Sequence, residues 1–253
     1  MDTIFLGEEQ LRKEFFCHKA RILLVGPSHS GFVPMSCMTE YTYVFRKSHY
    51  IGQLLEQEDS LWEQKFDSIH LFKTVPSAEY LKWSAGNPRL IIEDRTPKEA
   101  LEELSTAELE AYPRSLFIFD DYLTANKSKD SSLTEYFTAG SNHFNLSVIC
   151  TSQLLYSPNQ DLRTIALNST AIAVWPSFRD QQQLKTLSRQ VFPDAPLTFI
   201  GDSAKLANKY NSSPFKTPLL VQVSNFYFSD RLRVVSGLLP GEDLTVYQPT
   251  RAR

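Results

Sequence analysis

Five short apolar runs, separated by stretches with helical features, constrain the fold of this 253-residue chain more than any other feature. They cover residues Arg21 to Val25, Ile69 to Phe72, Ser115 to Phe119, Leu146 to Thr151 and Ala171 to Trp175. Most of them lack the polar–apolar alternation of a strand with one face in water. Unbroken runs of this length are typical of strands buried on both faces, so they predict a parallel sheet covered by helices.

The segments between these runs carry helix signals. Thr96-Pro97-Lys98-Glu99 predicts a helix start, because Thr can cap the helix, Pro fits its first turn and Glu completes a capping box. We expect that helix to stop near Pro113. We also predict a helix over Ser131 to Thr138, ended by Ala139-Gly140, and another from Asp180 to Pro193. Strands that alternate with helices predict an α/β fold with a central, largely parallel sheet flanked by helices.

The pattern is looser after residue 193. A short helix over Asp202 to Tyr210 and a strand over Leu219 to Val223 are our predictions for this part, and the tail that begins at Asp230 is expected to be irregular. We therefore divide the chain into an N-terminal extension (1–13), one domain (14–228) and a C-terminal extension (229–253).

Composition excludes several classes of protein. A net charge of -3 and a pI of about 6.0 do not fit a protein coated with positive charge for nucleic acid, although a local basic loop or pore stays open. Cys17, Cys37 and Cys150 are scattered and predict neither a disulfide scaffold nor a zinc site. No segment has the roughly 18 apolar residues of a membrane span, and the charged N-terminus does not resemble a signal peptide. We expect a soluble intracellular protein.

The loop after the first apolar run has the spacing of a phosphate-binding loop. Gly26-Pro27-Ser28-His29-Ser30-Gly31 keeps the pattern G-x-x-x-x-G, in which backbone N–H groups surround phosphate oxygens. The Lys that normally follows neutralises phosphate charge, and the next Ser or Thr binds Mg²⁺. Phe32 and Val33 can do neither. An ordinary turn between strand and helix is the alternative interpretation.

Two later segments supply polar residues in the order that a P-loop NTPase requires. The run Ser115 to Phe119 ends in Asp120 and Asp121, where a first carboxylate can hold Mg²⁺ and a second can orient the attacking water. A later run ends in Thr151-Ser152-Gln153, which places a polar residue where such proteins sense the γ-phosphate. A solvated Asp-Asp turn and a structural Gln are the alternatives for each segment alone.

Several segments together resemble the FtsK/HerA-type genome-packaging ATPases of eukaryotic DNA viruses and of Polinton/Maverick elements, which are related to the poxvirus packaging ATPase. The resemblance extends from residue 14 almost to the end of the chain. Its most specific part is Phe137 to Gln153, because no general fold pattern requires the particular residues of this segment. The similar segments read RILLVGPSHSG, SLFIFDDYL, YFTAGSNHFNLSVICTSQLLY, DLRTIALNSTAIAVW, SFRDQQQLKTLSRQVFP and DRLRVVSGLLPGE.

This resemblance implies a RecA-like P-loop NTPase fold of the additional-strand class. Gly26 and Gly31 match the phosphate loop of the family. Asp120 matches the carboxylate that organises Mg²⁺, Asp121 the catalytic carboxylate and Gln153 the sensor glutamine. The resemblance also implies ATP and Mg²⁺ as cofactors, with no cofactor as the alternative if the altered loop has lost binding.

Basic residues near the expected site leave more alternatives open. Arg163 and Arg179 lie in segments where an arginine finger could reach a neighbouring subunit, and a surface ion pair is the alternative. The family pattern calls for Lys-Thr at positions 32 and 33, and losing one such preorganised contact typically costs ~2.7–4 kcal/mol. Lys19 and Lys47 are possible substitutes, but neither has a spacing that identifies it.

Three functions remain open at this stage. The first is a packaging-ATPase homologue with a degenerate nucleotide site that hydrolyses ATP poorly or not at all. The second is an active DNA-translocating ATPase with a divergent loop, and the third is a non-enzymatic assembly or partner-binding protein. The resemblance implies double-stranded DNA and capsid components as partners, a homo-oligomeric ring, no membrane, and a location in the host cytoplasm, the nucleus or the virion.

Overall fold

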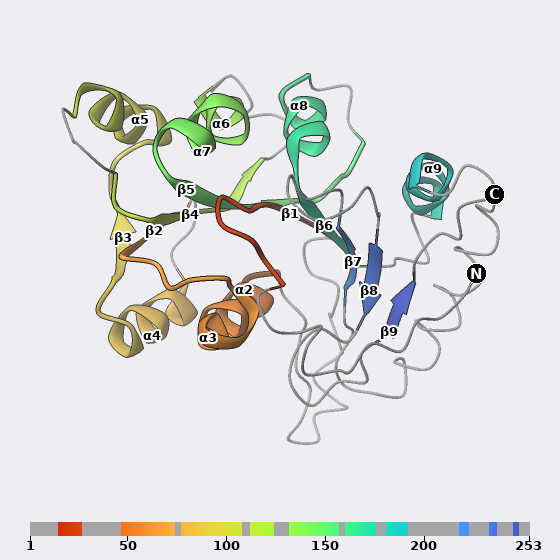
Figure 1. Cartoon of the computed structure of the whole chain (residues 1–253), viewed down its shortest axis with the longest axis horizontal. Helices are drawn as coiled ribbons and strands as arrows, with labels where there is room; N and C mark the ends of the chain where they lie inside the picture. Colours follow the sequence, from red (N-terminus) through yellow and green to blue (C-terminus); the bar gives the residue numbers. More distant parts are fainter. Residues whose placement is uncertain are drawn as a thin grey trace.

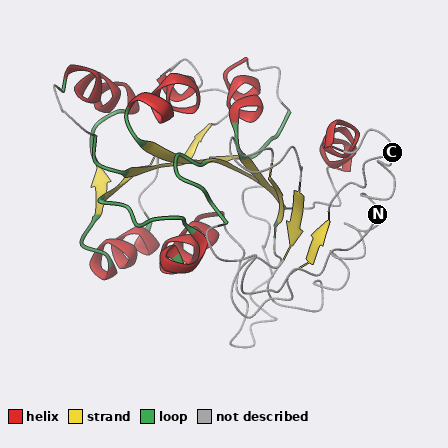
Figure 2. Cartoon of the chain, in the orientation of Figure 1, coloured by secondary structure: helices red, strands yellow, loops and turns green. Residues whose placement is uncertain are grey.

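Helices cover both faces of one sheet in the described parts of the chain (Figure 1, Figure 2). The computed structural model describes residues 15–26, 47–73, 77–107, 112–123, 132–156, 160–175, 181–191, 218–222, 233–236 and 245–247. Among these residues, no helix is both long and apolar enough to cross a membrane. The α/β class predicted from the sequence is confirmed.

The described strands join in one sheet with the order β3-β2-β4-β5-β1-β6-β7-β8-β9. Along this order the pairs from β3 to β6 are parallel, and the pairs from β6 to β9 are antiparallel. β5 lies between β1 and β4, which is the defining arrangement of the additional-strand class. The strands are β1 (Arg21–Val25), β2 (Ser68–Lys73), β3 (Leu90–Glu93), β4 (Ser115–Leu123), β5 (Leu146–Ser152), β6 (Ala171–Val174), β7 (Leu219–Gln222), β8 (Arg233–Ser236) and β9 (Thr245–Tyr247).

The helices separate into two layers (Figure 1). One face of the sheet is covered by α2 (Lys47–Glu56), α3 (Glu58–Leu61) and α4 (Ala78–Gly86). The other face is covered by α5 (Pro97–Thr106), α6 (Ser132–Glu135), α7 (Ser141–His143) and α8 (Gln160–Asn168), and α9 (Gln181–Val191) adds Leu187 to the same apolar cluster. Because parallel strands need crossover connections, this layering follows from the strand order.

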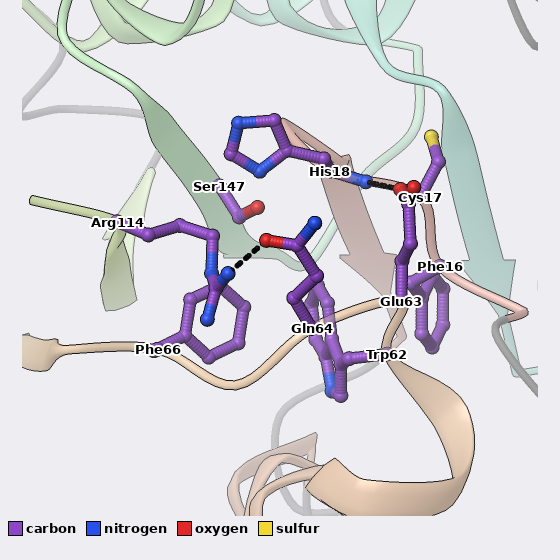
Figure 3. Close-up of a pocket in the computed structure, with 9 residues that line it drawn as sticks. All are labelled: Phe16, Cys17, His18, Trp62, Glu63, Gln64, Phe66, Arg114 and Ser147. Carbon is purple, nitrogen blue, oxygen red and sulfur yellow. Dashed lines mark hydrogen bonds between the residues drawn. The ribbon is translucent and has the colours of Figure 1, made fainter.

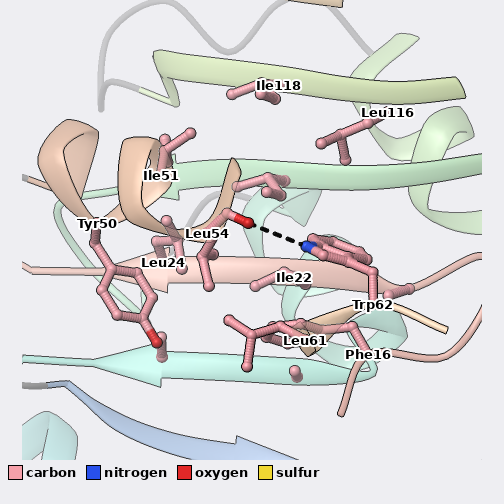
Figure 4. Close-up of a cluster of buried hydrophobic side chains, with 14 of the residues drawn as sticks. Phe16, Ile22, Leu24, Tyr50, Ile51, Leu54, Leu61, Trp62, Leu116 and Ile118 are labelled. Carbon is pink, nitrogen blue, oxygen red and sulfur yellow. Dashed lines mark hydrogen bonds between the residues drawn. The ribbon is translucent and has the colours of Figure 1, made fainter. Parts of the chain in front are cut away.

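The strand side chains divide between the two layers, as period-two alternation requires. Figure 4 shows the cluster on the α2 side, where Ile51 and Leu54 of α2 pack against Ile22, Leu24 and Ile118 of the sheet. On the other side lie the neighbouring strand residues, including Leu23, Phe119 and Cys150. The Cys150 side chain is fully buried, and burial raises the pKa of its thiol.

Several local predictions are confirmed. Each of the five apolar runs forms a strand, and the strand ends differ from the predicted ends by at most four residues. α5 begins with the expected capping box, in which the Thr96 hydroxyl accepts from the Glu99 N–H at 3.2 Å and the Glu99 carboxylate accepts from the Thr96 N–H at 2.7 Å. The helix predicted after Asp180 is α9, and the strand predicted at Leu219 is β7.

Other local predictions were wrong. β3 was not predicted: it has only three apolar residues, and it lies at the edge of the sheet with Ile91 exposed. The helix expected to end at Ala139-Gly140 continues through a π-helical turn, Tyr136–Gly140, into α7. Two pieces of the tail that we expected to be irregular are the strands β8 and β9. The helix predicted over Asp202 to Tyr210 lies outside the described residues.

Close packing of α2 on α4 generates a stability prediction. A Cβ atom at Gly52 would lie 2.7 Å from Nε1 of Trp83, whereas a Cβ at Gly86 would meet no atom within 4 Å. Overpacking of this kind costs about 1–3 kcal/mol, so Gly52→Ala should lower the free energy of unfolding by that amount in a urea titration. Gly86→Ala, the matched control, should leave it unchanged or raise it slightly, because Ala favours helix. Equal effects at both positions would contradict this packing.

Candidate functional site

The candidate site lies at the carboxyl edge of the sheet, where β1, β5 and β4 end side by side. Val25 pairs with Ser152, and Gly26 directly after β1 donates its N–H to the Ser152 carbonyl at 3.1 Å. β4 pairs with the other side of β5 and runs on through Asp120. Ligands of open α/β sheets bind outside the carboxyl ends of the strands, which makes this edge the first place to examine.

Asp120 is the centre of a buried network of hydroxyl groups. Asp120 is only 1% exposed. Oδ1 accepts from Thr151 Oγ1 at 2.8 Å, and Oδ2 accepts from Tyr80 OH at 2.6 Å and from Ser48 Oγ at 2.7 Å. A buried charge is tolerated only with such partners. Three separate elements, β5, α4 and α2, therefore hold this carboxylate in one position.

The tyrosine of this network is a hydrogen-bond donor that stays protonated. Burial, followed by the negative charge of Asp120, raises the pKa of Tyr80 well above its ordinary value. The phenol therefore stays protonated throughout the neutral range and donates a hydrogen bond to Asp120. Tyr80 thus positions the carboxylate and is no candidate for an acid or a base.

Asp121 follows Asp120 with an unusual backbone. Its φ is 55°, in the left-handed region, and the pairing of β4 with β5 shifts register between Phe119 and Leu123. Its N–H donates to Thr151 Oγ1 at 2.7 Å, so one threonine hydroxyl fixes both aspartates. Bulges of this kind re-aim side chains and are common beside active sites. The half-buried Asp121 is therefore a second carboxylate at the same edge, with a backbone conformation different from that of Asp120.

Lys47 brings a positive charge to this edge. It is the first residue of α2 and only 9% exposed, and its Nζ donates to the Gly26 carbonyl oxygen at 2.7 Å. Burial lowers the pKa of the Lys47 amine, and the charges of Asp121 and Asp120 oppose that shift. Of the two lysines considered as substitutes from the sequence, Lys47 thus reaches the site. Lys19 precedes β1 at the opposite edge, where its Nζ donates to the Asn142 carbonyl at 2.9 Å.

Gly26 is confined by a tryptophan. A Cβ atom on Gly26 would lie 3.2 Å from Cβ of Trp175, the residue after β6. The backbone N–H of Trp175 donates to the Val25 carbonyl at 3.0 Å. The Trp175 ring also meets the Tyr50 ring edge to face, with centroids 5.4 Å apart. A glycine is needed here for close approach. The start of the loop is therefore shaped by β6 as well as by β1.

Other predicted site residues lie nearby but outside the network. Gln153 directly follows β5 and is exposed. Arg163 is an exposed residue in the first part of α8. Since α8 leads from the carboxyl end of β5 back to the amino end of β6, its first turn lies toward the candidate site. The sensor role of Gln153 and the finger role of Arg163 stay predictions.

The rest of the predicted loop cannot be compared. Its residues lie outside the described part of the chain, as does Arg179, and they are Pro27, Ser28, His29, Ser30, Gly31, Phe32 and Val33.

Four residues of the site were missed or left unassigned by sequence reasoning: Ser48, Tyr80, Thr151 and Lys47. Thr151 belonged to the polar end of β5, where only Gln153 was selected. Lys47-Ser48 is a Lys followed by a hydroxyl residue, the pair that the loop lacks, and this wording was the available signal. Tyr80 has no sequence signal, because its position depends on the packing of α4.

The donors at this edge fit Mg²⁺ bound together with a nucleotide. Magnesium prefers one or two carboxylates with substrate phosphates and waters. Ser48 Oγ and the Asp120 carboxylate are oxygen donors 2.7 Å apart. The described residues hold no cluster of three or more His, Cys, Asp or Glu for a metal ion, so phosphate oxygens would have to complete the coordination.

A small, shallow pocket lies at the opposite, amino edge of the sheet (Figure 3). It lies among Trp62, Phe66 and Arg114, and it is also lined by Phe16, Cys17, His18, Glu63, Gln64 and Ser147. Burial lowers the pKa of the His18 imidazole, and the backbone N–H of His18 donates to the Glu63 carboxylate at 2.8 Å. None of the predicted site residues lines this pocket, so the carboxyl edge remains the candidate site.

Comparisons with known proteins identify structural neighbours only. No protein-family model matches the chain, and no curated protein matches it in sequence. Among solved structures, the genome packaging NTPase B204 from Sulfolobus turreted icosahedral virus 2, in complex with AMP, is 14% identical with a TM-score of 0.42, covering 91% of this chain and 98% of that chain. EssC (ATPases 2 and 3) from Geobacillus thermodenitrificans is 12% identical with a TM-score of 0.43, covering 93% of this chain and 40% of that chain. Scores at this level do not establish a shared function.

The hydroxyl of Thr151 generates a prediction for the site. Thr151→Val keeps the shape but leaves an oxygen of the buried Asp120 and the Asp121 N–H without their partner. Unsatisfied buried groups cost about 1–3 kcal/mol, so the free energy of unfolding should fall by that amount. Thr164→Val is the control, because the Thr164 hydroxyl only donates to the Gln160 carbonyl within α8, and it should change stability by less than about 0.5 kcal/mol. Similar losses in both variants would contradict the network.

Proposed function

We propose that this chain binds ATP with Mg²⁺ at the carboxyl edge of its sheet and hydrolyses it slowly, as a homologue of the genome-packaging ATPases that its sequence resembles. The observation that carries the proposal is the position of Asp120, a buried carboxylate at the end of β4, with β5 inserted between β4 and β1. An acidic strand end beside a G-x-x-x-x-G loop is the arrangement that P-loop NTPases use.

The residues of this chain would divide the work in the following way. Backbone N–H groups of the loop that begins at Gly26 would contact the phosphates. Asp120 would hold Mg²⁺, which supplies neutralisation of phosphate charge when bound. Asp121, held by its own hydrogen bond to Thr151, would orient the attacking water and accept its proton. Gln153 would contact the γ-phosphate from the end of β5.

Slow hydrolysis is the expected result if no other residue replaces the two that the loop lacks. Phe32 and Val33 replace the phosphate-binding Lys and the Mg²⁺-binding hydroxyl. The acidic pair does not compensate for a missing positive charge. Such a chain keeps the parts that bind water and metal while losing part of the stabilisation of the transition state.

An active, ATP-driven DNA translocase is the second candidate. The observation that favours it is the buried Lys47 at Gly26, because this lysine supplies a cation from outside the loop. Double-stranded DNA, capsid components and assembly into a homo-oligomeric ring belong to both candidates and rest on the sequence resemblance.

ATP binding with and without Mg²⁺ tests the proposal. By calorimetry, the wild type should bind ATP more tightly with Mg²⁺ than with EDTA, and Asp120→Asn should remove that difference because it removes the metal-binding charge. Asp121→Asn should keep ATP affinity but reduce turnover by about 10²-fold or more, as expected for a general base. A folded wild type that binds no ATP in either condition would exclude a nucleotide site and leave the assembly or partner-binding role.

The exposed Arg163 generates a prediction about assembly. If it reaches a nucleotide across a subunit boundary, Arg163→Ala should lower ATP turnover per chain by about 10³-fold without changing ATP affinity. Turnover per chain should also rise with protein concentration as the ring forms, which sedimentation velocity would detect. Arg189→Ala, at an exposed basic residue of α9, is the control and should change neither quantity. A monomer with unchanged turnover in Arg163→Ala would refute the finger role.

A further inference from the structure

We propose that Lys47 and Ser48 supply the phosphate-binding ammonium and the Mg²⁺-binding hydroxyl that positions 32 and 33 lack. This inference rests on the proposed ATP site and names the residues that complete it. The phosphate site would then be assembled from two places in the sequence, the loop that begins at Gly26 and the start of α2.

The position of α2 carries the first step. α2 packs on the sheet through Ile51 and Leu54, against strand residues such as Ile22, Leu24 and Ile118 (Figure 4). Its first residue, Lys47, reaches the end of β1, and its second, Ser48, reaches the end of β4. The helix therefore begins between these two strand ends. In a P-loop NTPase, the helix that carries the Lys and the Ser or Thr begins at the same place.

The contacts of the two side chains carry the second step. Lys47 Nζ donates to the carbonyl of Gly26, the first residue of the loop, and Ser48 Oγ donates to Asp120. Mg²⁺ in P-loop NTPases is held by the loop hydroxyl together with the acidic strand. A hydroxyl that gives its proton to the carboxylate keeps lone pairs for the metal. Ser48 and Asp120 thus already form that pair.

The energetics of Lys47 carry the third step. An ammonium group that is buried to 9% exposure loses most of its hydration, and a single backbone carbonyl is a weak replacement. Two phosphate oxygens would be better partners for its three donors. The same position can also be read as a lysine that only neutralises Asp120 and Asp121, and the experiment must separate the two roles.

Comparing ATP with AMP separates them. Lys47→Met should weaken Mg-ATP binding by about tenfold or more while leaving AMP binding unchanged, because only ATP carries the outer phosphates that the ammonium would contact. Lys19→Met, at the opposite edge, is the matched control and should change neither affinity. Equal weakening of ATP and AMP in a folded Lys47→Met variant would mean a structural role and overturn the inference. If that variant fails to fold by circular dichroism, Lys47→Gln is measured in the same way.

Ser48→Ala tests the hydroxyl. ATP affinity in EDTA should match the wild type, and the gain in affinity from Mg²⁺ should fall by about tenfold. An unchanged gain would show that Ser48 only holds Asp120.

A loop variant distinguishes failure of this inference from failure of the proposed ATP site. Phe32→Lys with Val33→Thr should add little to a wild type that already binds Mg-ATP through Lys47. If the wild type does not bind and this double variant does, the ATP site exists but Lys47 does not complete it. If neither binds, the ATP site and the inference are both wrong. If wild type and Lys47→Met bind ATP equally, the site stands and the inference fails.

Discussion

The hydrogen bonds to the Asp120 carboxylate are the constraint on which the rest of the site depends. They join α2, α4 and β5 at one buried charge, through Ser48, Tyr80 and Thr151. Burying this carboxylate without all three donors would cost several kcal/mol. The geometry of the candidate site therefore depends on how α2 and α4 pack on the sheet. Each helix is held by its apolar face and oriented by one hydroxyl.

Asp120 and Asp121 are adjacent in the sequence but have different backbone conformations at this edge. Asp120 is held by hydroxyl groups of α2, α4 and β5, whereas Asp121 leaves the regular strand through a positive φ and a shift in register. One hydroxyl, that of Thr151, serves both residues. This arrangement lets two adjacent carboxylates avoid identical surroundings, which is a condition for giving them different chemical roles. A regular strand would have placed them on opposite faces of the sheet.

The sequence predicts the sheet well and the site in part. Unbroken apolar runs such as Leu146 to Thr151 identify buried strands because burial on both faces leaves no other pattern, and the acidic end of β4 follows from its position after such a run. Tyr80 could not be assigned, because its role arises from helix packing that brings distant residues together. Lys47 and Ser48 form a recognisable Lys-Ser pair, but only the packing of α2 shows that this pair reaches the site. β8 and β9 were also missed, because they become strands only by pairing: β8 pairs with β7, and β9 pairs with β8.

Trp175 gives the candidate site a consequence of a different kind. Its ring packs against the backbone of Gly26 and against Tyr50, and the residue is only 9% exposed. Indole emission responds to nearby charge and to changes in local packing. A ligand that binds at the start of this loop would change the charge and the packing near Trp175, because Trp175 contacts Gly26. The protein therefore contains its own fluorescent reporter beside the proposed phosphate site, in a chain with only three tryptophans.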